Sequence, residues 1–153
     1  MSVAPERLPH VDEHALVVEA GREPTWLALQ KVVEAAVSAA GAPRFARALG
    51  CADTAASGPR PLQAGSTLPG FHVSAAAAPV ALALAGSHRF SDYALIFRLD
   101  ALGAGRTRVR AETRAEFPGL KGGIYRTLVI RTRMHVLVTR RILTGVKRNA
   151  ERI

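Results

Sequence analysis

The sequence predicts an α+β fold in which a curved antiparallel sheet wraps around a long C-terminal α-helix. Several segments between residues 10 and 117 alternate apolar and polar side chains, as half-buried strands do. Residues 122–152 instead carry apolar side chains at helical spacing. Strands and helices are segregated along the chain, which favours an antiparallel sheet. A length of 153 residues with 48% hydrophobic residues fits one globular domain, residues 1–153.

The N-terminal region is predicted to hold a leader followed by the first strand. Residues 1–9 contain Pro5 and Pro9 and are expected to form a loose leader. Residues 10–20 alternate in polarity and are expected to form a strand. His14 lies on the inward parity of this strand but near its end, so we expect its ring to be solvated.

One or two short helices are expected after the first strand. Residues 26–40 have helical apolar spacing, with Thr25 as a plausible N-cap and Gly41 at the end. Residues 44–49 fit one further short helix. Residues 51–69 are rich in glycine and proline and are expected to form a loop.

Four further strands are predicted, at residues 71–76, 80–84, 93–99 and 106–117. The last alternates most clearly, with Thr107 to Phe117 facing one side and charged residues facing the other. Glu112 falls on the solvent parity of this strand, so no inward carboxylate is expected as a general base. The expected interior acid–base groups are His135, Tyr93 and Tyr125.

The C-terminal helix is predicted to bury a wide apolar stripe against the concave face of the sheet. Two polar residues, Arg131 and His135, lie within this stripe. Burying them is costly unless they are paired or hydrated. Either protein groups satisfy them inside the core, or the interior holds a cavity with water or ligand. The stripe consists of Ile124, Leu128, Arg131, His135, Val138, Ile142 and Val146.

Charge and composition narrow the function classes. The net charge is +9, but 18 of the 21 basic residues are Arg, as a GC-rich genome tends to encode, and aromatic residues do not interleave with them. We therefore expect no specific nucleic-acid partner. The N-terminus has no signal-peptide pattern, and no apolar run is long enough to insert in a membrane. With Cys51 as the single cysteine, a cytoplasmic location is expected.

Catalytic and metal motifs are not evident in the sequence. The histidines lack the i, i+4 spacing of a metal site, so we expect no metal and no cofactor. The serines lack a nucleophile elbow, and no glycine-rich phosphate loop follows a strand.

The order of elements resembles the START-like, or Bet v 1-like, superfamily of helix-grip proteins (the SRPBCC, polyketide cyclase-type group). The local resemblance is to uncharacterised bacterial members and is carried by His88-Arg-Phe-Ser-Asp-Tyr-Ala-Leu-Ile-Phe97, Arg106-Thr-Arg-Val-Arg-Ala-Glu-Thr113, Phe117-Pro-Gly119, Tyr125-Arg126 and His135. The resemblance implies a fold with an apolar cavity between sheet and helix. The fold hosts carriers, receptors and cyclases, so it implies function poorly.

The favoured hypothesis is that a small hydrophobic or amphipathic ligand binds in this cavity. The residues expected to contact it are His135, Arg131, Tyr125, Tyr93, Trp26, Leu128 and Phe97. Whether the chain is an enzyme is left open, the alternative being a polyketide cyclase/dehydratase-like enzyme with His135 as acid and base. A second alternative is an interaction domain whose basic helix face, Arg126, Arg133, Arg140 and Lys147, binds an acidic partner. The alanine-rich strands over residues 75–85 are candidates for a homodimer contact.

Overall fold

The scaffold is one six-stranded antiparallel sheet with strand order β1-β6-β5-β4-β3-β2. The computed structural model describes residues 5–38, 41–119, 123–124, 126–127 and 134–152. The strands are β1 (His10–Val18), β2 (Thr67–Leu68), β3 (Phe71–Ala77), β4 (Ala81–His88), β5 (Ser91–Gly103) and β6 (Arg106–Glu116). The described helices are α1 (Arg22–Val37), α2 (Ala42–Leu49) and α4 (Met134–Glu151), with a 3-10 turn, η1 (Pro5–Arg7).

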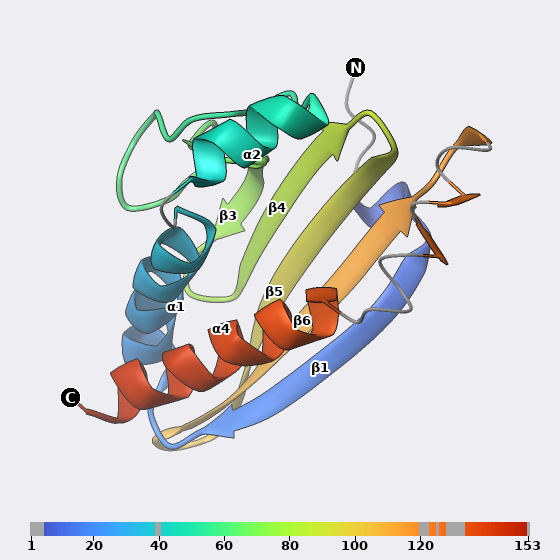
Figure 1. The fold of residues 1–153 in the computed structure, drawn as a ribbon. Helices are drawn as coiled ribbons and strands as arrows, with labels where there is room; N and C mark the ends of the chain where they lie inside the picture. The colour runs from blue at the N-terminus through green and yellow to red at the C-terminus, as the bar shows by residue number, and fades with distance from the viewer. Residues whose placement is uncertain (1–4, 39–40, 120–122, 125, 128–133, 153) are drawn as a thin grey trace.

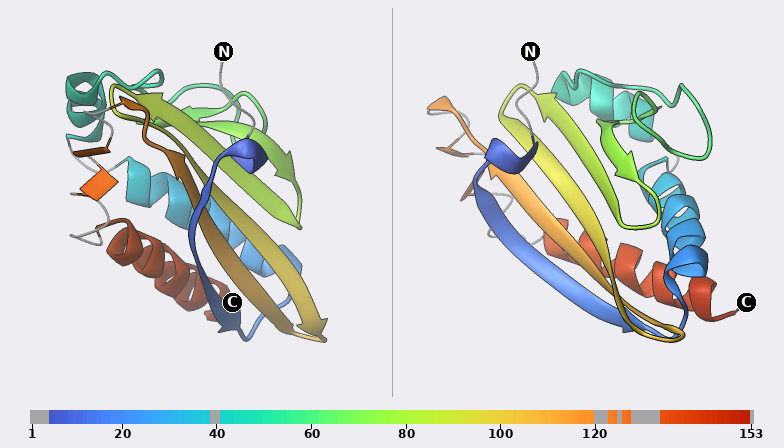
Figure 2. Two further views of the ribbon diagram at one scale, coloured as in Figure 1. Left: turned by 90° about the vertical axis from the view of Figure 1, so that its right-hand side faces the viewer. Right: turned by 180° about the vertical axis from the view of Figure 1, so that it is seen from behind.

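The helices lie on one face of the sheet, which we call the inner face. Figure 1 shows α4 crossing in front of β5 and β6, with α1 beside its C-terminal end and α2 further along the sheet. From behind, η1 is seen on the outer face, against the strands (Figure 2). The predicted α+β arrangement of an antiparallel sheet around a C-terminal helix is therefore confirmed.

The main core lies between the inner face, α1 and the C-terminal half of α4. Its largest fully buried side chains include Phe97, Leu29, Leu99, Ile142 and Val146. Burial of each such side chain is worth about 1.5–3 kcal/mol. Close helix packing is visible at Gly145, where an added Cβ would lie 2.9 Å from Val32 of α1. This end of the molecule is thus tightly closed.

The start of α1 differs from the prediction. The helix begins at Arg22 rather than residue 26, because Pro24 falls in the first turn, where its missing N–H costs nothing. Thr25 is consequently not the N-cap, and its hydroxyl donates to the carbonyl of Gly21 at 2.7 Å. The second short helix is confirmed as α2, and it ends at Gly50 with a left-handed φ of 74°.

Residues 51–69 form mostly irregular structure, as expected, but their end contributes the short strand β2. Thr67 and Leu68 pair with His72 and Phe71 of β3. Beyond β2, Val73 of β3 exchanges backbone hydrogen bonds with Gly65 and Ser66. The homodimer contact stays a prediction.

The C-terminal helix is confirmed over α4, Met134–Glu151, but the buried stripe is shorter than predicted. Residues 123–124 and 126–127 are helical, whereas residues 128–133 lie outside the described residues. Ile124 is 59% exposed, so the predicted stripe does not continue to its side chain. The buried face of α4 also includes Thr139 and Leu143, and α4 packs against α1.

Candidate functional site

The inner face changes from a closed core to an accessible surface along its length. On α4, Val146 is fully buried, whereas Val138, two turns earlier, is 43% exposed. On β5, Leu99 and Phe97 are buried and Tyr93 is only half-buried. On β6, Val109 is buried and Thr113 is half-buried. Solvent therefore reaches the inner face at the end of the sheet that lies beyond the packed half of α4, which we call the open end.

The open end carries a carboxylate and an imidazole side by side. Asp12 pairs across β1 and β6 with Thr113, and His14 pairs with Ala111. Directly opposite residues of antiparallel strands point to the same side, so both side chains lie on the inner face. His14 Nε2 lies 3.4 Å from Asp12 Oδ2, and the two side chains are 22% and 24% exposed. The expectation that no inward carboxylate exists is therefore wrong.

A β-bulge in β1 determines which of these polar residues face inward. The pairing register shifts between His10 and Asp12, so one extra residue lies on β1. His10 consequently pairs with Arg114 and faces outward, although it shares sequence parity with Asp12 and His14. The bulge brings Asp12 and His14 together on the inner face, and it separates them from His10.

The polar contact between Asp12 and His14 is incomplete. Nε2 of His14 is shielded from solvent yet forms no hydrogen bond with any described residue, because its contact with Asp12 is poorly aligned. A buried polar atom without a hydrogen bond costs about 1–3 kcal/mol. The expectation of a solvated His14 ring holds only in part, since about a fifth of the side chain is exposed and Nε2 is buried.

Tyr93 lies on the same open end, held in one orientation by its neighbours. Its hydroxyl donates to the carbonyl of Gly70 at 2.5 Å, and Cys51 Sγ lies 3.8 Å from the same oxygen. The ring packs edge-on against Phe71 and crosses Gly86, where an added Cβ would lie 2.2 Å from Gly70 O. Tyr93 and Asp12 are separated by β6, which corresponds to roughly 10 Å.

His88 completes the polar set near Tyr93. Its ring centroid lies 5.4 Å from that of Tyr93, and its Nδ1 accepts a hydrogen bond from the backbone N–H of Phe90 at 3.1 Å. Burial lowers the pKa of His88, and the nearby Asp92 carboxylate opposes that effect. His88 is therefore biased toward the neutral imidazole.

The structure does not bring all the predicted ligand contacts together. Trp26 and Phe97 belong to the packed main core, and Phe97 lies level with His14, because both pair with Ala111 of β6. Tyr93 is half-buried at the open end. Arg131, Tyr125 and Leu128 lie outside the described residues. His135 lies within α4, but its side chain is outside the description as well. The ligand-binding roles of these residues stay predictions.

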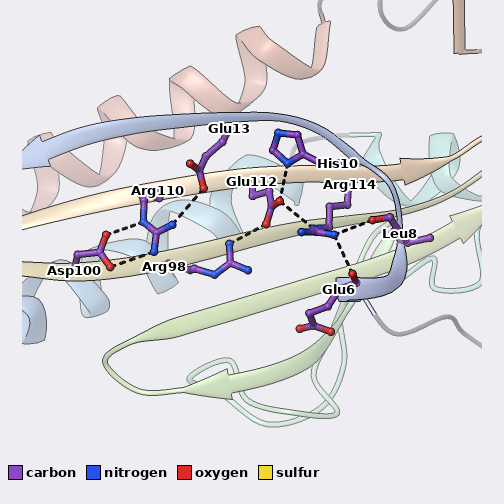
Figure 3. Close-up of polar contacts among 9 residues, drawn as sticks. All are labelled: Glu6, Leu8, His10, Glu13, Arg98, Asp100, Arg110, Glu112 and Arg114. Carbon is purple, nitrogen blue, oxygen red and sulfur yellow. Dashed lines mark hydrogen bonds and ion pairs between the residues drawn. The ribbon is translucent and has the colours of Figure 1, made fainter.

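The outer face carries a dense network of ion pairs (Figure 3). Glu112 faces outward as predicted, but it is only 5% exposed rather than solvated. Its carboxylate accepts hydrogen bonds from His10 Nδ1 at 2.7 Å, Arg98 Nη1 at 2.9 Å and Arg114 Nε at 3.0 Å. Burial alone would raise the pKa of Glu112, but these hydrogen bonds outweigh it and hold the pKa at about 2.

The network also explains why the described part of the leader is ordered. Arg114 Nη1 donates to the backbone carbonyls of Glu6 and Leu8, both at 2.9 Å (Figure 3). Leu8 packs against a small outer cluster of Ala83, Ala94 and Ile96. Residues 5–9 are therefore held on the outer face, and the prediction of a loose leader is wrong for them.

Other surface features are separate from the open end. An open depression beside α2 is lined by Gly41, Pro43, Arg44 and Arg47. Among the described residues, no three His, Cys, Asp or Glu side chains gather closely enough to hold a metal ion. No helix in the same part of the chain is long and apolar enough to span a membrane.

The predicted basic helix face is partly engaged within the protein. Lys147 Nζ donates to the carbonyl of Val17 and to Glu151, at 3.3 and 2.5 Å. Arg126 and Arg140 are exposed, and Arg133 lies outside the described residues.

Comparison with known proteins supports the fold. No protein-family model and no curated protein matches the sequence. Similar solved structures include the Zhui aromatase/cyclase from Streptomyces sp. R1128, which is 15% identical over 95% of each chain with a TM-score of 0.55. Norcoclaurine synthase from Thalictrum flavum, in complex with dopamine and hydroxybenzaldehyde, is 11% identical over 91% of this chain and 86% of its own, with a TM-score of 0.53.

A conserved protein from Geobacillus kaustophilus is 13% identical over 92% of this chain and 94% of its own, with a TM-score of 0.53. The chain thus has the helix-grip fold of the START-like, or Bet v 1-like, proteins, as the resemblance in sequence implies. At these identities the likeness establishes the fold alone, and function must be argued from the site.

The sequence contains a signal for part of the site. Asp12 lies two residues before His14 on β1, so the alternation of this strand predicts that both side chains face the same side. The approach of Cys51 and Gly70 to Tyr93 has no such signal, since residues 51 and 70 are brought there by the irregular segment after α2.

Proposed function

We propose that the chain binds a small amphipathic molecule on the inner face, at the open end of the sheet. The observation that carries the proposal is the change in burial along one continuous face. Apolar side chains fill the closed end completely, whereas at the open end Tyr93, Thr113, Asp12 and His14 are only partly covered. Small-molecule sites typically combine a mostly apolar surface with a few polar groups, and the inner face has this combination toward its open end.

The spacing of the polar groups limits the size of the ligand. Tyr93 and the Asp12–His14 pair flank β6, roughly 10 Å apart, with the small side chains of Thr113 and Ala115 between them. A molecule of one or two rings matches this width. A similar structure is described with dopamine and hydroxybenzaldehyde, two molecules of that size.

The experiment compares two tryptophan substitutions on the same strand. Thr113→Trp places a large ring on the inner face at the open end, whereas Arg108→Trp places it on the exposed outer face. Binding of 2-naphthol, measured by calorimetry on the full chain, should fall at least about 10-fold with the first substitution and remain unchanged with the second. Equal affinity in both variants would contradict the proposal.

We propose no second function. The cyclase-type alternative depends on the His135 side chain, and the acidic-partner alternative depends on a basic face of which Lys147 is engaged with Val17 and Glu151. Neither gains support from a contact among the described residues.

A further inference from the structure

We propose that Asp12 and His14 form a polar subsite that selects ligands carrying a hydroxyl group, an alcohol or a phenol. The hydroxyl donates a hydrogen bond to Nδ1 of His14. This inference rests on the proposed function, because the subsite acts on a ligand that occupies the open end. It goes further in naming the chemical group that the site recognises and the atom that recognises it.

The placement of the pair is the first support. The bulge in β1 turns Asp12 and His14 inward, where they are opposed by Thr113 and Ala111 of β6. Below them on β1, Leu16 packs against the core and Val18 is fully buried. The pair therefore lies where the apolar interior ends and the accessible surface begins. A ligand on the accessible part of the inner face would meet these two side chains with its polar end.

The contact geometry gives each imidazole nitrogen a different role. Nε2 lies 3.4 Å from the Asp12 carboxylate, which favours the tautomer with the proton on Nε2. In that tautomer Nδ1 carries the lone pair and accepts hydrogen bonds. No hydrogen bond joins Nδ1 of His14 to any described residue. The nitrogen is thus available to a donor supplied by the ligand.

Electrostatics explains which polar groups are rejected. An ether or ketone has no proton to donate to Nδ1, so its oxygen would face an acceptor at close range. A carboxylate would also meet the negative charge of Asp12 in a partly dehydrated site. A hydroxyl group satisfies Nδ1 because it donates its proton to the nitrogen.

The chain contains a matched control on the outer face. His72 Nδ1 lies 3.1 Å from Asp53 Oδ2, and these side chains are 28% and 24% exposed, close to the values for His14 and Asp12. His72 pairs with Ala85, which pairs with Ala94 of the outer cluster, so His72 faces away from the proposed ligand. Replacing His72 removes an equivalent His–Asp pair without touching the inner face.

The test measures the affinities of 2-naphthol and its methyl ether, 2-methoxynaphthalene, by calorimetry. These probes share the ring system and differ in the ability of their oxygen to donate. The wild-type chain should bind 2-naphthol at least about 10-fold more tightly. That preference should fall below about 3-fold in His14→Leu and remain in His72→Leu. Asp12→Asn, which keeps the side-chain size, should weaken it in the same direction.

The outcomes separate this inference from the proposed function. Equal binding of both probes by the wild-type chain overturns the hydroxyl subsite and leaves ligand binding standing. A preference that survives in a folded His14→Leu variant also overturns it. Binding of neither probe counts against the proposed function itself. Circular dichroism of each variant establishes that it is folded, and Asp12→Asn decides the question if His14→Leu does not fold.

Discussion

On the outer face of the sheet Glu112 accepts hydrogen bonds from three side chains, whereas on the inner face His14 Nε2 lies near Asp12 without forming one. Both sites involve β1 and β6, on opposite sides of the same two strands. The outer group is held by protein alone. On the inner face, Nε2 of His14 has no hydrogen-bond partner among the described residues. This difference is the reason for proposing a structural role for the outer face and ligand binding for the inner face.

The largest expected effect comes from breaking the outer network. Glu112→Gln removes the buried charge that neutralises Arg98 and Arg114, and it should lower the free energy of unfolding by about 3 kcal/mol. Urea unfolding at neutral pH measures the change. Affinity for 2-naphthol should remain unchanged in the folded variant. A loss of less than about 1 kcal/mol would contradict the structural role of the outer face.

The same carboxylate makes stability depend on pH. The pKa of Glu112 is lowered from 4.5 to about 2 in the folded chain, so its contribution is complete above pH 4.5 and is lost as pH falls toward 2. The loss amounts to about 3 kcal/mol. Urea unfolding between pH 5 and pH 2 should show a decline that Glu112→Gln flattens. An unchanged decline in that variant would assign the effect to other groups.

A glycine at the open end should give the next largest effect. Gly86→Ala would place a methyl group 2.2 Å from the Gly70 carbonyl and 2.6 Å from the Tyr93 ring, so β4 or the ring must move. The free energy of unfolding should fall by about 2 kcal/mol. Gly21→Ala is the control, since its nearest heavy atom lies at 3.9 Å. Similar thermal stability of the two variants would show that Tyr93 is not held as described.

The inner pair should matter little for stability. His14→Leu removes a poorly aligned contact together with the unsatisfied Nε2, so it should lower the free energy of unfolding by less than about 1 kcal/mol, if at all. Chemical unfolding beside Glu112→Gln provides the comparison. A loss as large as that of Glu112→Gln would place His14 among the structural residues and remove the contrast between the faces.

The smallest expected change in stability comes from removing an exposed ion pair. Arg106 and Glu19 lie 3.1 Å apart, and both side chains are more than half exposed. Arg106→Gln should change the free energy of unfolding by no more than about 0.5 kcal/mol, and less at high salt. A larger change would mean that paired charges on the outer face do not need burial to stabilise the chain.

Local patterns predict much of this fold, because alternation and helical spacing record which side chains are buried. β6 follows its predicted parity residue by residue, and α2 ends at Leu49, as predicted. The bulge near His10 depends on long-range pairing with β6, and simple parity puts His10 and Asp12 on one face. Likewise, the burial of Glu112 follows from Arg114 binding the carbonyls of Glu6 and Leu8, over 100 residues away in sequence.

The histidine ring resonances of the full chain test the contrast between the faces most directly. His14 faces inward, whereas His10 and His72 face outward with their own carboxylate partners. On titration with 2-naphthol, the ring proton signals of His14 should shift in proportion to occupancy, and those of His10 and His72 should remain in place. Shifts at His10 or His72 with His14 unchanged would contradict ligand binding at the open end of the inner face.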